Sequence, residues 1–460
     1  MKKKHFEWFE KDPAFYKKLA LIAIPLAGQS VITFAVGLAD NLMVSHLGES
    51  SIGGIYIANQ IQGILHMLLM GLGAALVILA AQYYGRGDIR SVKIIISFSI
   101  YIAVGVGLLL LILMTFFGRQ VLSGLSDAES VISEGLAYMA WLRWSFVIFG
   151  LTNVLLASMR CAGTVNIGIV AALTAFFANL VFNYIFIFGN FGAPEMKVAG
   201  AAFATLLSRI FECGVIVFYV LRRDVKIRYR PRDLTLRSKT MSWDYVRYGL
   251  PVIFGDIFWG LGNTAKAAII GRLGESVIAA SSIVGNLSQL FTIFIYGAAS
   301  AGSLTVGQVI GKNDYETAKK YAKTLQIVYP CVGVLSAAIM FSLRGTALSL
   351  PAFQALAPET MRHCMEFITI LCVTMIGSSY QMATLQIVRA GGATHFVFLN
   401  DMIFVWLVMI PMALIALFVF GAPPWVVFLC IHCDQILKCG VAVVKINRFR
   451  WMKNLTRQTV

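Results

Sequence analysis

The stretch LALIAIPLAGQSVITFAVGLADNLMVS, residues 19–45, contains one charged side chain, Asp40. It is long enough to cross a membrane, because roughly 20 residues of helix span a hydrocarbon core of about 30 Å. Of the 460 residues in the chain, 58% are hydrophobic and only 13% are charged, and the mean hydropathy is +0.78. This composition excludes an ordinary soluble protein and predicts an integral membrane protein.

Similar apolar segments recur along nearly the whole chain and leave no room for a sizeable soluble domain. We therefore predict an all-α membrane protein with twelve transmembrane helices. The predicted spans are 19–45, 52–83, 94–117, 134–158, 167–189, 198–221, 243–271, 277–310, 324–344, 361–387, 396–420 and 424–445.

The two halves of the chain are related by an internal repeat. At an offset of 226 residues, Pro25 aligns with Pro251 and LGES at 47–50 aligns with LGES at 273–276. Further along, Arg160 in RCAG aligns with Arg389 in RAGG, which requires one three-residue insertion. Six spans in each half give both halves the same orientation, so we predict two lobes related by a pseudo-twofold axis along the membrane normal.

This organisation predicts five parts of the chain. They are a cytoplasmic N-terminal segment (1–18), an N-lobe (19–221), a basic cytoplasmic linker (222–242), a C-lobe (243–445) and a cytoplasmic C-terminal tail (446–460).

The net charge of +16 lies mainly in the loops. Placing both termini in the cytoplasm puts most of the 38 Lys and Arg residues on the inner side, as the positive-inside rule requires. We therefore expect a multi-pass protein of the cell (inner) membrane. The basic linker is interpreted as a topology determinant beside anionic lipid rather than as a nucleic-acid site.

Asp40 is the clearest candidate for a functional residue. A carboxylate inside a span costs roughly 2.5–3.5 kcal/mol on insertion scales, which indicates a function or a partner. In the fifth span Asn179 and Asn183 are one turn apart, and Thr205 lies in the sixth. Their oxygens suit hydrogen bonding around a carboxylate or ligation of Na⁺. Polar side chains at helical spacing are, however, more often interhelical contacts.

The equivalent of Asp40 in the second half is Lys266, ten residues after Asp256. Lys266 is interpreted as a counter-ion to Asp40 or Asp256, a fixed charge for an anionic substrate, or a snorkelling side chain. Asp401 is a further candidate, and Asp434 and Lys438 are expected to form an i,i+4 ion pair. Asp256 and Lys266 are also candidates for the lining of a substrate cavity, together with the aromatic, Met and Gln side chains of Tyr56, Met67, Trp259, Tyr296 and Gln381.

Motifs for other functions are missing from the sequence. It contains no GxxxxGKS/T phosphate loop and no HExxH motif. Cys430 and Cys433 form a CxxC around His432, but this spacing also stacks two residues on one helix face, so metal binding is not the favoured interpretation. The chain is therefore expected not to be an enzyme and to need no cofactor.

Several motifs, in order and in duplicate, make the chain resemble the multidrug and toxic compound extrusion (MATE) transporters. The resemblance covers nearly the whole chain. It rests on the Pro25-to-Asp40 spacing and on motifs that occur in order: LGES twice, AQYYGRGD and GQVIGKND, RCAG and RAGG, and NYIFIFG. It implies two lobes that alternate between inward-open and outward-open states and export organic, often cationic, compounds in exchange for H⁺ or Na⁺.

Carried over by position, the resemblance implies roles for individual residues. Asp40 matches a carboxylate implicated in cation coupling, Pro25 a proline associated with bending of the first helix, and Asn179 and Thr205 polar members of the same site. Asn183 departs from the aspartate of many prokaryotic relatives, which favours H⁺ over Na⁺. A C-lobe glutamate used by another branch is also missing, because Trp259 occupies its position.

We therefore expect a cation-coupled multidrug exporter that acts on amphipathic small molecules, contacts membrane lipid and functions as a monomer. The alternatives are a flippase or exporter of a lipid-linked or anionic metabolite, which Lys266 would suit, and a non-transporting membrane scaffold.

Overall fold

The structure is a computed structural model that describes residues 9–348 and 357–457, and within these ranges it contains helices and no strand. Ten of the described helical segments are long and apolar enough to cross a membrane, and a bent pair forms an eleventh. The remaining predicted span coincides with α9 (Lys239–Ile270), which is equally long but carries Asp256 and Lys266. The predicted all-α membrane fold is confirmed.

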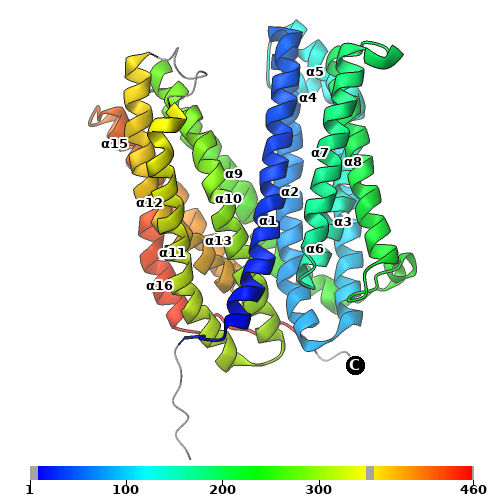
Figure 1. Cartoon of the computed structure of the whole chain (residues 1–460), viewed down its shortest axis with the longest axis vertical. Coiled ribbons are helices and arrows are strands. Elements are labelled where there is room, and N and C mark those ends of the chain that lie inside the picture. The colour runs from blue at the N-terminus through cyan, green and yellow to red at the C-terminus, as the bar shows by residue number, and fades with distance from the viewer. Residues whose placement is uncertain (1–8, 349–356, 458–460) are drawn as a thin grey trace, which may run out of the picture. The chain divides into compact units, whose positions relative to one another are not determined.

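The helices of the first half, drawn from blue to green in Figure 1, follow the predicted spans. They are α1 (Pro13–Val44), α2 (Glu49–Arg86), α3 (Ile89–Phe116), the short α4 (Gly118–Ser123), α5 (Glu129–Leu142), α6 (Ser145–Cys161), α7 (Asn166–Phe188) and α8 (Lys197–Arg222). The fourth span is α5 and α6 together, bent by 53° between them. This break was not predicted.

The second half repeats this order with two interrupted spans. Its helices after α9 are α10 (Glu275–Gly311), α11 (Tyr315–Leu348), α12 (Pro358–Ala390), α13 (Thr394–Met402), the π-helix η5 (Ile403–Met409), α14 (Ile410–Phe418), α15 (Pro424–His432) and α16 (Asp434–Asn447). The eleventh span is therefore α13, η5 and α14, and the twelfth is α15 and α16. Pro411 cannot donate to the carbonyl four residues earlier, and the helix widens immediately before it.

The chain forms two compact units, whose division falls at equivalent places in the repeat. The N-unit is Gly28–Ile253, and the C-unit comprises the described residues up to Ala27 and from Phe254 onward. Each division lies two residues after an aligned proline, Pro25 or Pro251. The first helix of each half therefore begins in one unit and ends in the other.

Two aligned glycines allow these helix starts to pack closely. A Cβ added to Gly71 of α2 would lie 2.8 Å from Ile253 Cα in α9, and one added to Gly297 of α10 would lie 2.8 Å from the carbonyl oxygen of Ala23 in α1. Such distances exclude any side chain unless the backbone moves. The repeat thus preserves one close helix contact in each unit.

The duplicated LGES motif also has a structural reason. Gly48 and Gly274 have φ values of 96° and 106°, in the region that favours glycine, and each immediately precedes a helix. Glu49 and Glu275 then occupy the first turns of α2 and α10, where a negative charge stabilises the helix dipole.

Each unit has its own apolar core. In the N-unit, α2 packs against α3, α5 and α6 through a buried stripe at helical spacing, formed by Leu65, Leu69, Leu72, Leu76 and Leu79. In the C-unit, α12 packs against α10, α11 and α16, and the rings of Phe367 and Phe428 stack with their centroids 3.9 Å apart.

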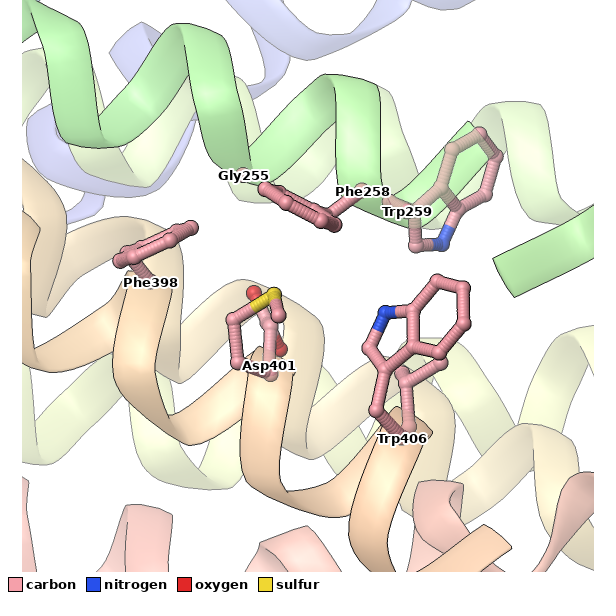
Figure 2. Close-up of a pocket in the computed structure, with 8 residues that line it drawn as sticks. Gly255, Phe258, Trp259, Phe398, Asp401 and Trp406 are labelled. Carbon is pink, nitrogen blue, oxygen red and sulfur yellow. The ribbon is translucent and has the colours of Figure 1, made fainter. Parts of the chain in front are cut away.

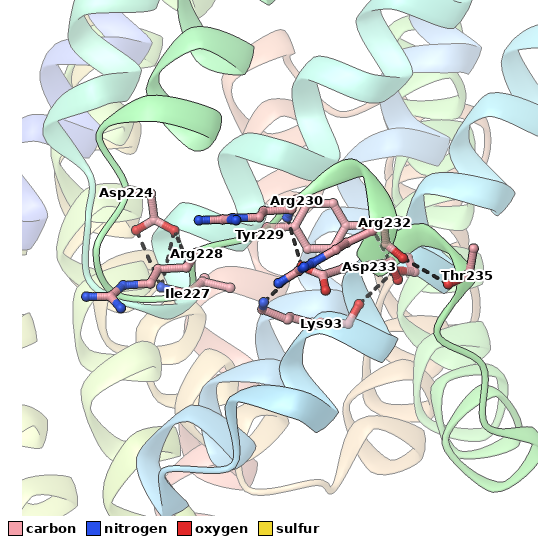
Figure 3. Close-up of polar contacts among 10 residues, drawn as sticks. Lys93, Asp224, Ile227, Arg228, Tyr229, Arg230, Arg232, Asp233 and Thr235 are labelled. Atoms are coloured by element: carbon pink, nitrogen blue, oxygen red, sulfur yellow. Dashed lines mark hydrogen bonds and ion pairs between the residues drawn. The ribbon is translucent and has the colours of Figure 1, made fainter.

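The basic linker between α8 and α9 is a folded element of the N-unit (Figure 3). The Asp224 carboxylate accepts hydrogen bonds from the backbone N–H groups of Lys226 and Arg228 at 3.1 and 2.8 Å. The Asp233 carboxylate, in the turn η3 (Pro231–Thr235), accepts from Arg230 N–H at 2.8 Å and pairs with Lys93 of α3 at 2.8 Å. Two carboxylates thus hold a segment that composition alone describes as a polar loop.

The role of Asp233 can be tested by amide hydrogen exchange. Asp233→Ala removes a largely buried ion-pair partner and leaves Arg230 N–H without its acceptor, so exchange across 224–236 is expected to rise by an amount equivalent to about 2–4 kcal/mol of local stability. Arg232→Gln, which alters an exposed side chain of the same turn, should leave exchange unchanged. Equal protection in both variants would show that the carboxylate does not hold the linker.

Candidate functional site

Asp40 and Asn183 meet in the N-unit, although 143 residues separate them. Asn183 Nδ2 of α7 donates to Asp40 Oδ1 of α1 at 2.6 Å. Asp40 is partly exposed, whereas the Asn183 side chain is fully buried. A carboxylate that is only partly buried and is held by a neutral amide can gain or lose a cation without breaking an ion pair with Asn183.

Asn179 extends this contact along α7. Its Oδ1 accepts a second hydrogen bond from Asn183 Nδ2 at 3.1 Å, and its side chain is 1% exposed. The Asn179 side chain also interacts with the Asp40 carboxylate. Among the described residues, Asn183 Oδ1 has no hydrogen-bond partner. The cluster therefore keeps one free acceptor beside Asp40, which can rearrange when the carboxylate changes its charge.

Thr205 lies in α8, and Tyr138 of α5 connects it with this cluster. The Thr205 hydroxyl donates to the carbonyl of Ala201 at 2.9 Å, which leaves its lone pairs free to accept. The buried Tyr138 hydroxyl interacts with Thr205 and lies within electrostatic range of Asp40. Sequence reasoning missed Tyr138, because nothing distinguishes it from the other tyrosines of the spans.

A charged pair in the middle of α8 was also missed. Arg209 and Glu212 form a salt bridge of 2.7 Å with side chains 22% and 8% exposed, and Arg209 lies within electrostatic range of Asp40. The guanidinium also lies 4.5 Å from the ring centroid of Phe149, and His66 stacks on the same ring at 5.8 Å. The sequence does contain an indication of this pair, because charged residues inside a predicted span indicate a function or a partner.

Pro25 lies inside α1, where it removes one backbone hydrogen bond close to the point at which the helix passes between units. Its role in bending remains a prediction.

The charged residues of the C-unit pair with one another. Asp256 of α9 lies 3.7 Å from Arg389 of α12, so its partner is this arginine and not Lys266. Lys438 of α16 bridges Asp401 at 3.0 Å and Asp434 at 3.2 Å. The expected pairing of Asp434 with Lys438 is confirmed, and Asp401 is an additional partner.

Lys266 lies among charged residues of the twelfth span. The groups within electrostatic range of its ammonium include Asp434, Lys438 and His432. His432 Nδ1 lies 2.9 Å from the Phe428 carbonyl oxygen. Within the described part of the chain, no group of three or more His, Cys, Asp or Glu residues could hold a metal ion.

Trp259 lines a narrow pocket in the C-unit that we call the aromatic slot (Figure 2). Its walls come from α9, α13 and η5 and consist of Gly255, Phe258, Trp259, Phe398, Asp401, Met402, Val405 and Trp406. The other predicted cavity residues are not part of it. Tyr56 and Met67 belong to α2 of the N-unit, and Tyr296 and Gln381 belong to α10 and α12 of the C-unit.

Curated relatives of the chain carry one recurring description. A protein of Thermotoga maritima, described as a probable multidrug resistance protein NorM, is 25% identical over 67% of this chain and 66% of its own length, just under two thirds. A protein of Streptococcus pneumoniae with the same description is 23% identical over 88% of this chain and 89% of its own length.

Solved structures share the fold. One describes an outward-facing conformation of a multidrug resistance MATE family transporter of the MOP superfamily; it has a TM-score of 0.85 at 19% identity and covers 96% of this chain and 100% of that one. A MOP superfamily transporter from Pyrococcus furiosus has a TM-score of 0.85 at 18% identity, over 95% and 97% of the two chains.

A family model described as MatE matches residues 25–185 and, separately, 251–429. The two matches begin at Pro25 and Pro251, the aligned prolines of the internal repeat, and together they cover well over half of the chain. Members of this family are transporters and not enzymes. The chain belongs to the MatE family, as the repeat and the duplicated motifs predict.

Proposed function

We propose that the protein is a secondary active exporter that exchanges organic, often cationic, amphipathic compounds for a cation bound at Asp40. The observation that carries the proposal is the single carboxylate of the N-unit cluster, held by the amide of Asn183 at 2.6 Å. The drug and the cation must bind the inward-open and outward-open states with different affinities, because otherwise no coupling arises.

The geometry favours H⁺ as the coupling ion over Na⁺. Asn183 turns its N–H donor, and not its oxygen, toward Asp40, and Asn179 Oδ1 already accepts from Asn183. A sodium ion needs several converging oxygens, whereas a proton needs only the carboxylate. In this proposal Asp40 takes a proton from the outer side, and its neutralisation favours substrate release and the return to the inward-open state.

Further parts of the proposal follow from the class of transporter. The substrates are small organic molecules, the surroundings are the lipids of the cell membrane, and the functional unit is a monomer with both termini in the cytoplasm. The basic linker supports this orientation, since Arg228, Arg230 and Arg232 are exposed in the segment that follows α8.

Proteoliposomes with separately imposed pH and sodium gradients test the proposal. Ethidium transport is expected to follow the pH gradient and to be unchanged by a sodium gradient at constant pH. Transport driven only by sodium would reverse the assignment of the ion. Absence of flux under both gradients would favour a scaffold, and movement of a lipid-linked or anionic compound instead would favour the function that Lys266 suits.

A further inference from the structure

The basic linker lies along one face of α3. Lys93, Ser97 and Tyr101 follow one another at intervals of four residues, so they project from the same side of this helix. The Lys93 ammonium pairs with the Asp233 carboxylate at 2.8 Å, and the Ser97 hydroxyl lies 2.8 Å from the Asp233 carbonyl oxygen. The Tyr101 hydroxyl donates to the carbonyl of Leu234 at 2.7 Å. Since eight residues of helix rise about 12 Å, the linker follows α3 over more than two turns.

The surface of α3 changes where the linker ends. From residue 91 to residue 100 every side chain is buried or half-buried. Tyr101 is exposed, and further along the helix Leu108, Leu109 and Ile112 are exposed apolar side chains of the kind that faces lipid. Tyrosine is typical of the boundary between lipid and water, because its ring is apolar and its hydroxyl is polar. The linker residues that Tyr101 contacts therefore lie at the depth of the lipid headgroups.

The arginines of the linker have no carboxylate partner. Residues 222–242 include eight Lys and Arg residues and two Asp residues, which gives a net charge of +6. Both carboxylates are already occupied, Asp224 by backbone N–H groups and Asp233 by Lys93 and a backbone N–H (Figure 3). Throughout 222–242, all of which the structure describes, no arginine forms an ion pair. Their exposed guanidinium groups are therefore available to an anion from outside the chain.

The surroundings of these arginines fit a phospholipid better than a soluble anion. A guanidinium group can donate two parallel hydrogen bonds to a phosphate group. The Arg237 guanidinium lies 5.6 Å from the ring centroid of Tyr101, so a positive charge and an exposed apolar ring meet at one place. Val225 of the linker and Trp243 at the start of α9 are exposed as well. A partner with an anionic head and apolar chains can contact both kinds of side chain, whereas free phosphate leaves the apolar ones in water.

We propose that Arg230, Arg232 and Arg237, together with Tyr101, form a binding surface for the phosphate group of an anionic phospholipid in the cytoplasmic leaflet. We call it the linker surface. The choice of leaflet rests on the proposed orientation of the chain, but the binding chemistry depends neither on Asp40 nor on transport. The positive-inside rule acts on the insertion of the chain and needs no fixed site. The linker surface, in contrast, is held on α3 by hydrogen bonds and would keep the N-unit attached to the lipid headgroups.

Native mass spectrometry of the purified full chain in detergent tests the linker surface. The chain is titrated with phosphatidylglycerol or with phosphatidylcholine of the same acyl chains, and the wild type is expected to bind phosphatidylglycerol about tenfold or more tightly. The triple variant Arg230→Gln, Arg232→Gln and Arg237→Gln removes three guanidinium groups. Its dissociation constant for phosphatidylglycerol should rise about tenfold or more, while that for phosphatidylcholine stays unchanged. Amide exchange across 224–236 checks that the linker is still folded.

Three controls accompany the titration. The triple variant Lys312→Gln, Arg448→Gln and Arg450→Gln removes the same charge from exposed positions of the C-unit and should bind phosphatidylglycerol like the wild type. Glycerol phosphate has the phosphate group but no acyl chains, and it should not displace phosphatidylglycerol at millimolar concentration. Asp40→Asn should bind the lipid like the wild type even though it is expected to lose ion-coupled transport, so failure of the transport proposal and failure of the linker surface remain distinguishable.

Equal phosphatidylglycerol affinity in the wild type and the linker variant would overturn the linker surface. Equal weakening in both triple variants would overturn it too, because it would show attraction by net charge without a fixed site. Displacement by glycerol phosphate would replace the lipid by a soluble phosphate ester as the ligand. If the triple variant loses its exchange protection, Arg232→Gln alone decides: its dissociation constant should rise about three- to fivefold, and an unchanged value would contradict the proposal.

Discussion

Asp40→Asn is expected to abolish ion-coupled efflux while leaving the fold intact. The amide has nearly the shape of the carboxyl group and can still hydrogen-bond to Asn183, but it can neither take up a proton nor release one. Without a proton at this position the pH gradient no longer biases the equilibrium between the two states, so transport driven by it should fall to the level of liposomes without protein. The measurement is dye efflux from proteoliposomes, with thermal unfolding as the check on folding.

Asp127→Asn is the matched control for this experiment. Asp127 is an exposed carboxylate in the segment between α4 and α5, so the same chemical change there should leave efflux at the wild-type rate. If Asp40→Asn transports as fast as Asp127→Asn under a pH gradient, Asp40 has no part in coupling.

Lys438→Ala is expected to lower the free energy of unfolding more than any other substitution considered for this protein. The lysine side chain is only 5% exposed and pairs with two carboxylates, those of Asp401 and Asp434, the latter 8% exposed. Removing one partner of a buried ion pair leaves an uncompensated charge and typically costs about 3–5 kcal/mol. The free energy of unfolding, measured in detergent by denaturant titration, should fall by about this amount.

Two comparisons separate lost charge balance from lost packing. The triple variant Lys438→Met, Asp401→Asn and Asp434→Asn removes all three charges at similar volume and should regain most of the stability. Lys319→Ala breaks an exposed pair with Glu316, whose side chain is 65% exposed, and should cost less than about 1 kcal/mol. Equal losses for Lys438→Ala and Lys319→Ala would contradict the buried network.

The internal repeat, which relates one half of the sequence to the other, predicts more of the fold than any single residue does. The duplication of Pro25 at Pro251 and of LGES predicts two equivalent halves, and the structure adds a packing reason for the aligned glycines Gly71 and Gly297. A change of unit within each first helix was not predictable, because hydropathy reports that a segment is apolar and not which neighbours it packs against.

The breaks inside the spans could not be predicted from the sequence either. The bend between α5 and α6 and the π-helix η5 lie within stretches whose average hydropathy is that of one continuous span. The linker shows the reverse case, since its composition predicts a polar loop while Asp224 and Asp233 satisfy enough backbone N–H groups to fold it.

The sequence by itself determined the membrane class, the twelve spans, the repeat and the divergence of Asp40 from Lys266, because each of these depends on residue type and spacing. Only the tertiary structure decided the partners: Asn183 for Asp40, Arg389 for Asp256, and Asp401 as well as Asp434 for Lys438. The physical reason is that a polar group in a membrane span must find a partner on another helix, and the rotation of each helix about its axis, which selects that partner, is set by packing against its neighbours.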